Sequence, residues 1–412
     1  DLLLAALTVK ETIEFAAKLR LPQSLGDEER TRRVEQTLTQ LQLNDCADTA
    51  IGSEKQRGVS GGERKRCAVG VELVSRPPIL FLDEPTSGLD AASALSLALS
   101  LRKYAKDNEM IVLSSVHQPR SNIFSLFDRL LLLSKGSTVY YGSVAGAVPY
   151  IEEHAKLRLP PQTNPADWLI DLIDARSSEL LDAWRGFSEQ SAKGSGIADG
   201  SAPFSGSHGS NGASEHRVTK ATGTRTAGAG ARGPASANTG PTTSSWFQFR
   251  VLLARSAKQQ RGDVYNKTNC FQILAVAVIA ALLWSGDSNI SDRKGVLFFV
   301  NIQQAFNAQN TVLRLFPRER SLMLRERRCG SYRMLPYFLA KSASDSVSIF
   351  VLPVIYAIII YFSVGLRREA GAFFVYLALS LSTVFAGQSI GLIISLAVPD
   401  FALANCISFV AV

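Results

Sequence analysis

The first forty residues show apolar positions at helical spacing. Thr8 and Glu11 stand three residues apart at the head of one such stretch, the spacing of a capping box, in which each side chain satisfies the other residue's backbone donor. This pattern predicts one helix from Thr8 to about Arg20 and a second over roughly Asp27 to Leu41. The chain therefore opens as a globular, helical segment.

From residue 77 the pattern changes to short apolar runs that end in polar residues. Stretches of helix length separate the runs, which is typical of buried parallel strands in βαβ units. Lys135-Gly136 separates the last two runs and predicts a hairpin edge. We expect strands at 79–82, 110–116, 130–133 and 138–141.

Long uncharged runs fill the C-terminal part. Each complete run can span the roughly 30 Å of a bilayer core at about 1.5 Å per residue. Four such runs in series favour membrane helices over buried core helices. A basic amphipathic stretch with Trp246, Phe247 and Phe249 precedes them and suits a membrane surface. We place this elbow helix at about 245–262 and membrane helices at about 268–286, 295–313, 346–366 and 371–396, with another starting at 401 and truncated at 412.

Gly, Ser, Ala and Thr dominate the segment between these two regions and leave almost nothing that could form a core. This composition predicts a flexible, disordered linker. The predicted organisation is an α/β domain at 1–190, a linker at 191–244 and a transmembrane domain at 245–412.

Charge is distributed unevenly. The formal net charge is −4 for residues 1–190, +13 for 191–341 and −1 for 342–412. A nucleic-acid-binding protein would carry its basic face on the folded domain, so the distribution argues against that class. It favours cationic segments beside membrane helices and excludes a purely soluble enzyme. The segment 314–341 has eight basic and two acidic residues, which places it on the cytoplasmic side together with the N-terminal domain.

The octet Val59-Ser-Gly-Gly-Glu-Arg-Lys-Arg66 carries the first chemical signal. Ser60 and Glu63 form a second capping box, so the helix from Gly61 presents free backbone N–H groups and a positive dipole end. Gly61 and Gly62 lack the side chains that would keep an anion from those donors. By itself the octet also fits an ordinary capped helix.

Acidic residues follow the strand expected at 79–82. Asp83 and Glu84 stand at its carboxyl end, which is the edge where open α/β sheets bind ligands. An aspartate there can hold Mg²⁺, and the adjacent glutamate can activate a water for attack on a phosphate. His117 ends the next apolar strand, where a lone histidine is usually structural.

Together these motifs resemble those of the ATP-binding cassette (ABC) transporters. The matching motifs are the signature Ser60-Gly-Gly-Glu63, the Walker B motif Leu82-Asp-Glu-Pro85, the D-loop Ser87-Gly-Leu-Asp90 and the switch histidine in His117-Gln-Pro119. The order of ATPase before membrane domain, with Asn164-Pro-Ala-Asp167 and the segment Glu319–Glu326, is similar to the half-size G (White/brown) subfamily. The resemblance implies a partial α/β ABC-type nucleotide-binding domain followed by an all-α polytopic transmembrane domain.

The resemblance also assigns roles, with ATP and Mg²⁺ as cofactors. Glu84 would polarise the attacking water, His117 would sense the γ-phosphate, and Asp83 would bind Mg²⁺. The signature residues would contact ATP held mainly by the other subunit, and the D-loop aspartate would cross the dimer interface. The implied nucleotide-binding residues are Ser60, Gly61, Gly62, Glu63 and Asp90.

One family motif is absent: the sequence contains no G-x-x-x-x-G-K-[ST] phosphate-binding loop. We interpret the chain as a fragment of an active transporter, with that loop upstream and the last membrane helix downstream. A naturally degenerate non-ATPase is the alternative. On the first interpretation the 412-residue chain alone is predicted to be inactive as an ATPase.

The implied function is ATP-driven export of hydrophobic or lipid-like substrates by a dimer of half-transporters, homodimeric or heterodimeric, in contact with membrane lipid and without nucleic acid. The alternative is a non-hydrolysing partner subunit or membrane regulator that completes another subunit's ATP site. Four membrane-length runs exclude a soluble ABC ATPase. We expect an integral, multi-pass protein of the plasma membrane, or else of an internal membrane, with its ATPase domain in the cytoplasm.

Two membrane-domain segments carry further hypotheses. The run 295–313 is rich in amides, and Phe299, Gln303 and Phe306 share one stripe that suits a flat hydrophobic substrate with a polar handle. Hydrogen bonding between helices, without a ligand, is the alternative. The segment 314–341, partly helical over 318–328, is expected to receive the push of the ATPase, unless its arginines merely anchor to lipid headgroups.

Overall fold

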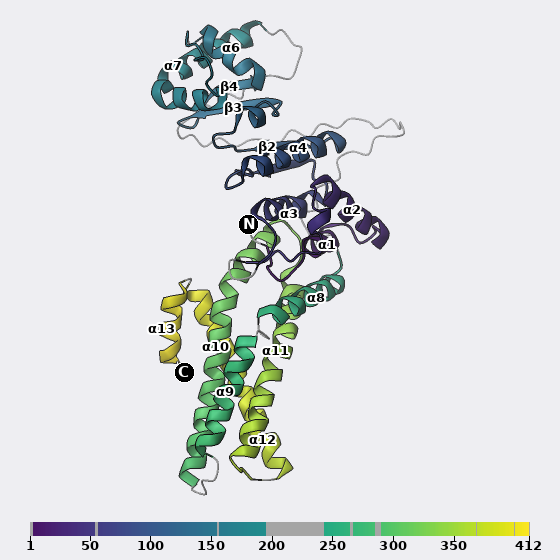
Figure 1. Cartoon of the computed structure of the whole chain (residues 1–412), viewed down its shortest axis with the longest axis vertical. Coiled ribbons are helices and arrows are strands. Elements are labelled where there is room, and N and C mark those ends of the chain that lie inside the picture. Colours follow the sequence, from purple (N-terminus) through teal and green to yellow (C-terminus); the bar gives the residue numbers. More distant parts are fainter. Residues whose placement is uncertain are drawn as a thin grey trace, which may run out of the picture. The chain divides into compact units, whose positions relative to one another are not determined.

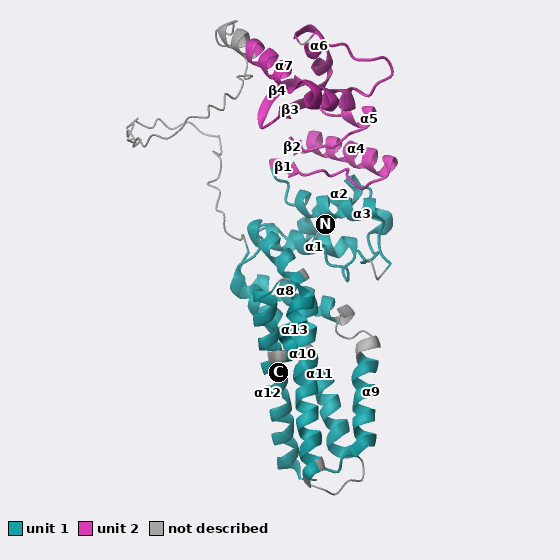
Figure 2. Ribbon diagram, turned by 90° about the vertical axis from the view of Figure 1, so that its left-hand side faces the viewer, with its two compact units in different colours: residues 1–77, 239–412 teal, residues 78–238 magenta. Residues whose placement is uncertain are grey.

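The computed structural model describes residues 3–53, 57–154, 156–194, 243–263, 267–284, 290–367, 369–398 and 400–411 (Figure 1). The chain divides into two compact units, one formed by Asp1–Pro77 with Thr239–Val412 and the other by Pro78–Asn238 (Figure 2). Apart from its two ends, the linker expected at 191–244 lies outside the described residues.

Three helices open the first unit: α1 (Val9–Arg20), α2 (Asp27–Gln40) and α3 (Gly61–Leu73). The capping box of α1 is present, because the backbone N–H of Glu11 donates to Thr8 Oγ1 at 3.2 Å and that of Thr8 donates to Glu11 Oε2 at 3.0 Å. The two helices predicted before residue 42 are therefore confirmed. Their apolar faces pack with α3 around fully buried side chains such as Leu7, Ile13, Leu41 and Leu73.

The second unit contains two strand pairs. Strands β1 (Ile79–Leu82) and β2 (Ile111–Ser114) pair in parallel, and helix α4 (Ala91–Asp107) connects them. Strands β3 (Arg129–Ser134) and β4 (Ser137–Ser143) form an antiparallel hairpin around Lys135 and Gly136, both of which have positive φ. The predicted strand–helix–strand unit and the hairpin are both confirmed.

The expectation that the parallel strands are buried is wrong for one face of the β1–β2 pair. Leu80 is 5% exposed, but Phe81 is 76% exposed and Ile111 is 59% exposed. Side chains alternate between the two faces of a strand, so a helix on one face leaves the other uncovered. Helix α4 packs against β2, and among the described residues nothing covers the face of Phe81.

Helices α5 (Ser121–Phe124), α6 (Val144–His154) and α7 (Pro165–Gly194) complete the second unit. Helices α6 and α7 pack on the β3–β4 hairpin through aromatic rings. Tyr150 lies at the centre, with ring centroids 5.2 Å from Tyr140 and 5.7 Å from Trp184. This apolar core anchors the segment that contains Asn164-Pro-Ala-Asp167.

The remaining helices belong to the first unit: α8 (Ser245–Asp263), α9 (Lys267–Trp284), α10 (Ile290–Arg328), α11 (Met334–Ser363), α12 (Ala370–Ala397) and α13 (Phe401–Ala411). Helices α9 to α12 run alongside one another in both views (Figures 1 and 2). Within the described ranges, α11 and α12 are the two helices long and apolar enough to cross a membrane, and Cys270–Trp284 forms a shorter apolar helix.

Helix α10 is longer than predicted. The sequence predicted a membrane helix at 295–313 and then a loop that is partly helical over 318–328, but all 39 residues from Ile290 to Arg328 form one continuous helix, about 58 Å long at 1.5 Å per residue. The residues at 318–328 are Arg, Glu, Leu, Met and Ser, most of which favour helices, and Pro317 leaves the helix unbroken. The helix stops before Gly330, whose φ of 68° suits a C-terminal turn.

Helix α8 forms where the elbow helix was expected, and two of its polar side chains are buried in the protein. Gln248 and Arg255 are almost fully buried, and the helix packs against α11 and α1. The Gln248 side chain donates to the Thr243 carbonyl at 2.9 Å and accepts from the backbone N–H of Arg333 at 3.0 Å. The buried polar side chain of Gln248 therefore binds other parts of the protein.

Helices α10 and α12 approach closely at two glycines spaced four residues apart. A Cβ atom on Gly387 would lie 2.4 Å from the carbonyl oxygen of Ala305, and one on Gly391 would lie 2.9 Å from that of Gln309. The missing side chains let the two backbones touch, as small residues do between membrane helices.

We expect Gly387→Ala to lower the free energy of unfolding by roughly 1–3 kcal/mol, because the added methyl meets backbone that cannot rotate away. Thermal unfolding of the purified full-length protein in detergent measures this loss. Gly371→Ala, in the same helix with open space around it, is the matched control. Equal stability of the two variants would contradict close packing at Gly387.

Candidate functional site

The signature segment begins helix α3 as its sequence predicts. The backbone N–H of Ser60 donates to Glu63 Oε2 at 2.8 Å, and the backbone N–H of Glu63 donates to Ser60 Oγ at 3.3 Å. Hydrogen bonds from the Ser60 backbone and hydroxyl lower the pKa of Glu63. Gly61 has open space where a Cβ would be, so the helix end around it is accessible. In this structure the Glu63 side chain serves as a cap.

Asp83 and Glu84 follow β1 directly, and Ser115 follows β2. The Ser115 hydroxyl donates to Asp83 Oδ1 at 2.6 Å and accepts the backbone N–H of Glu84 at 2.9 Å. Glu84 has a φ of 44°, in the left-handed region that few residues adopt without support. The parallel pairing of β1 with β2 thus brings both carboxylate residues to the strand end that leads to His117.

His117 lies two residues beyond Ser115 in an exposed turn. The next residue, Gln118, also has a left-handed φ, of 44°. Asn164 holds this turn, since its Nδ2 donates to the Pro119 carbonyl at 2.9 Å. The same Nδ2 donates to Asp167 Oδ2 at 3.0 Å. The sequence singled out the segment from Asn164 to Asp167 only as a family marker, and the structure makes it a support of the His117 turn.

Asp90 caps helix α4. Its Oδ1 accepts the backbone N–H groups of Ala92 and Ser93, both at 3.0 Å, and its Oδ2 accepts the Ser93 hydroxyl at 2.6 Å. The hydroxyl and backbone of Ser93 lower the pKa of Asp90, so this carboxylate stays charged near neutral pH. The D-loop aspartate is therefore held rigidly at the start of α4.

The residues at the β1 end fit a magnesium site of the kind that also binds phosphate. Within the described residues, no three His, Cys, Asp or Glu side chains converge on a metal-sized site. Mg²⁺ usually takes one or two carboxylates and completes its shell with phosphate and water, so a single oriented aspartate suffices. Asp83 would supply that carboxylate.

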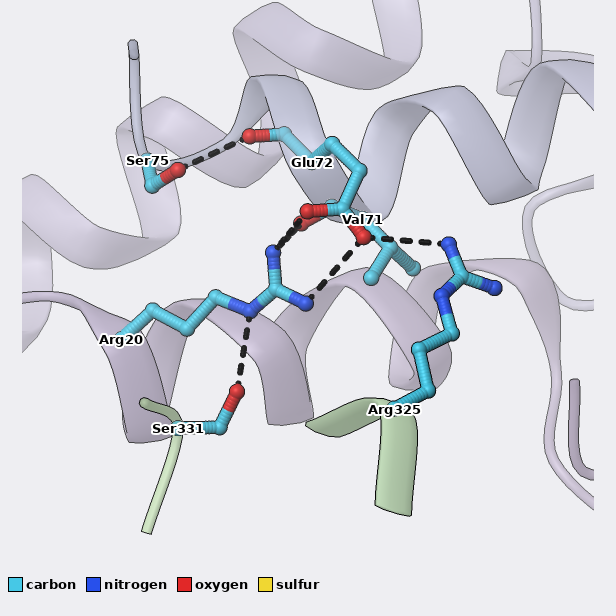
Figure 3. Close-up of polar contacts among 6 residues, drawn as sticks. All are labelled: Arg20, Val71, Glu72, Ser75, Arg325 and Ser331. Atoms are coloured by element: carbon cyan, nitrogen blue, oxygen red, sulfur yellow. Dashed lines mark hydrogen bonds and ion pairs between the residues drawn. The ribbon is translucent and has the colours of Figure 1, made fainter. Parts of the chain in front are cut away.

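Glu72 connects the signature helix to α10. Its carboxylate, near the C-terminal end of α3, pairs with Arg20 of α1 and with Arg325 of α10, the latter at 3.1 Å (Figure 3). Arg20 also donates to the Val71 carbonyl and to Ser331 Oγ, both at 3.2 Å. Burial alone would raise the pKa of Glu72, but the two arginines hold it below the ordinary value. Glu72 is thus charged and shared by three helices.

A second buried pair joins α8 to the same end of α10. Arg255 donates to both carboxylate oxygens of Glu326, at 2.6 and 2.9 Å, and Tyr332 donates to Glu326 Oε2 at 2.7 Å. Bidentate, charge-assisted bonds of this kind are the stronger class of hydrogen bond. Burial raises the pKa of Tyr332, so its hydroxyl remains a donor.

Two further ion pairs extend these contacts. Lys258 of α8 pairs with Glu11 of α1, and Lys341 of α11 pairs with Glu319 of α10 at 2.9 Å. The N-terminal helices, α8, α10 and α11 are therefore joined by charged side chains. Arg325 is thus paired with a carboxylate of helix α3.

Sequence reasoning missed Glu72 and Ser115. Glu72 is the one acidic residue in the otherwise apolar stretch 67–74, and an isolated charge in such a stretch is a signal for a partner. Ser115 precedes His117 by two residues at a strand end, but a serine there has no distinctive pattern.

The two aromatic residues of the stripe Phe299, Gln303 and Phe306 contact different helices. Phe299 stacks near Trp284 of α9 with ring centroids 5.7 Å apart, and Phe306 lies 4.6 Å from Phe409 of α13. A groove of about 370 Å³ lies on another side of α10, against α12. Its lining residues are Leu297, Phe298, Asn301, Ile302, Ala305, Thr383, Ala386, Gly387 and Ile390.

Comparison with known protein families agrees with this arrangement. Residues 1–87 match the family described as ABC transporter, and residues 247–412 match the family described as ABC-2 type transporter. A second family of the ABC-2 type matches residues 117–180. Both the ATPase part and the membrane part are thus recognised by separate families.

Two relatives show the similarity along nearly the whole chain. "ABC transporter G family member 14" from Arabidopsis thaliana is 33% identical over 398 residues, which cover 95% of this chain and 60% of the relative. "Broad substrate specificity ATP-binding cassette transporter ABCG2" from Mus musculus is 32% identical over 412 residues, or 96% of this chain and 61% of the relative. The chain thus spans about 60% of the length of these curated relatives.

Proposed function

Because the chain belongs to the G subfamily of ABC transporters, we propose that the complete protein is an ATP-driven exporter that works as a dimer of two half-transporters. The exported compounds are hydrophobic or lipid-like, and the protein crosses the membrane several times with its ATPase domain in the cytoplasm. Homodimers and heterodimers are both compatible with this proposal.

The contact of Glu72 with Arg325 carries the proposal. Helix α3 has the signature residues at its start and Glu72 near its end, so a movement of the nucleotide-binding end displaces Glu72 as well. Arg325 lies on the continuous helix α10, which extends back through the apolar run 295–313. Helix α3 from the signature residues and helix α10 from the membrane domain therefore meet at the ion pair of Glu72 with Arg325. This contact supports coupling of ATP use to the membrane helices.

The residues of the β1 end would act as follows. Asp83 would hold Mg²⁺, and the bound ion would neutralise charge on the phosphates. Glu84 would orient and deprotonate the attacking water, and His117 would contact the γ-phosphate. Ser60, Gly61 and Gly62 would offer backbone and hydroxyl donors to the phosphate of ATP held by the second subunit.

Reconstitution of the full-length protein in lipid vesicles tests this function. We expect magnesium-dependent ATP hydrolysis and ATP-dependent movement of a lipid-like fluorescent compound away from the cytoplasmic face. Hydrolysis that appears only after a second, different subunit is added, and that persists when Glu84 of this chain is replaced by Gln, would support the alternative of a non-hydrolysing partner. No hydrolysis in either case would reject both.

The stripe on α10 gives a separate prediction. We expect Phe306→Ala in the full-length protein to change which compounds stimulate ATP hydrolysis and to leave the basal rate within about twofold, since the ATP site is untouched. ATPase assays over a panel of hydrophobic compounds measure this. If the variant instead unfolded at a lower temperature with an unchanged compound profile, the ring would serve only to pack against Phe409.

A further inference from the structure

One side chain, Ser115, ties together the three residues at the exit of β1. Its backbone N–H donates to the Leu82 carbonyl at 3.0 Å, which extends the ladder between β1 and β2. Its hydroxyl donates to Asp83 Oδ1 at 2.6 Å and accepts the backbone N–H of Glu84 at 2.9 Å. Ser115, two residues before His117, thus forms hydrogen bonds with three consecutive residues, Leu82, Asp83 and Glu84.

The direction of these bonds follows from the atoms involved. A serine hydroxyl has one proton and two lone pairs, and a backbone N–H can only donate. The Ser115 hydroxyl must therefore donate its proton to Asp83, while its oxygen accepts the backbone N–H of Glu84. The arrangement orients Asp83 with Oδ1 bound to serine, so Oδ2 is the oxygen left for a metal ion.

The bond to Glu84 also accounts for an unusual backbone. A non-glycine residue with a φ of 44° is held in a sparsely populated region, and such conformations persist where neighbouring groups fix them. The Ser115 hydroxyl, which accepts the Glu84 N–H at 2.9 Å, is one such group.

We propose that Ser115 is a positioning residue of the ATP site, which orients Asp83 for Mg²⁺ and Glu84 for water and joins both to the strand of His117. The inference rests on the proposed ATPase function and adds a residue to it. Residues that orient a metal ligand from behind typically change metal affinity or activity by about 10–100-fold when replaced.

The test compares Ser115→Ala, Ser115→Thr and the neighbouring Ser114→Ala in the full-length protein. We expect Ser115→Ala to weaken the binding of Mn²⁺ with ATP by about 10-fold or more, measured by electron paramagnetic resonance in a Glu84→Gln background that prevents turnover. Ser115→Thr keeps the hydroxyl and should restore affinity to within about threefold. The hydroxyl of Ser114 donates to the Ser115 carbonyl at 3.1 Å, away from Asp83 and Glu84. Ser114→Ala should therefore change the Mn²⁺ affinity by less than twofold.

The outcomes separate this inference from the proposed function. If the unmodified full-length protein hydrolyses ATP and Ser115→Ala has unchanged Mn²⁺ affinity and turnover, the role of Ser115 is rejected and the exporter stands. If the unmodified protein has no turnover with or without a second subunit, the exporter proposal fails first. An equal loss in Ser115→Ala and Ser115→Thr would also reject the role of the hydroxyl.

Discussion

Glu84→Gln in the full-length protein is expected to reduce ATP turnover by about 100-fold or more while ATP binding is retained. Glutamine keeps the size and the backbone of the residue, and with them the bond from the Glu84 N–H to Ser115 Oγ. It removes the charge that would take the proton of the attacking water. Steady-state phosphate release and equilibrium binding of a fluorescent ATP analogue measure the two effects separately.

The matched control is Glu153→Gln, an exposed glutamate of helix α6. It should leave turnover within about twofold, because the same change of charge is made away from the strand ends. Turnover near normal in Glu84→Gln would assign the proton transfer to another group, and His117 would be the next to replace.

Glu72→Gln is expected to abolish stimulation of ATP hydrolysis by transported compounds. The neutral amide leaves Arg20 and Arg325 without the carboxylate they share, and removing one partner of a buried ion pair costs about 3–5 kcal/mol. Glu72 keeps 23% of its side-chain exposure, so we expect the lower end of that range. Thermal unfolding and stimulated ATPase activity, both on the full-length protein, measure the two consequences.

Charge reversal at two nearby arginines gives a control for this contact. Arg325→Glu should reproduce the loss seen in Glu72→Gln, whereas Arg327→Glu should not, because the described residues give Arg327 no ion pair. Equal effects of the two reversals would mean that the charge of the segment matters and the pairing with Glu72 does not.

The pH dependence of this contact has a definite sign. Because the arginines lower the pKa of Glu72 in the folded protein, its stabilising effect is complete above the ordinary value of 4.5 and is lost as the pH falls through the lowered value. The stability difference between the natural protein and Glu72→Gln should therefore be constant near neutral pH and shrink only in acid. A difference that shrank between pH 8 and 6 would contradict the assignment.

Local patterns were sufficient for much of the candidate site. The capping boxes at Thr8 and Ser60 involve residues three positions apart, so sequence alone predicts them. The placement of Asp83 and His117 at the carboxyl ends of paired strands follows from apolar runs joined by a helix of fixed handedness. The hydroxyl bridge of Ser115 needed the register of β1 against β2, in which Leu82 lies opposite Ser114.

The sequence by itself determined the family motifs, the starts of α1, α2 and α3 and the positions of the strands, because each depends on spacing within a few turns of chain. It did not determine where α10 and α11 begin, since uncharged runs report which residues are apolar and not how far a helix continues beyond them. Tertiary structure decided which charges meet. Arg325 and Glu72 are 253 residues apart, and Arg255 and Glu326 are 71 apart. Periodicity reports which face of a helix is apolar, but it does not report which other helix packs beside that face, and only that packing brings Glu72 between two arginines.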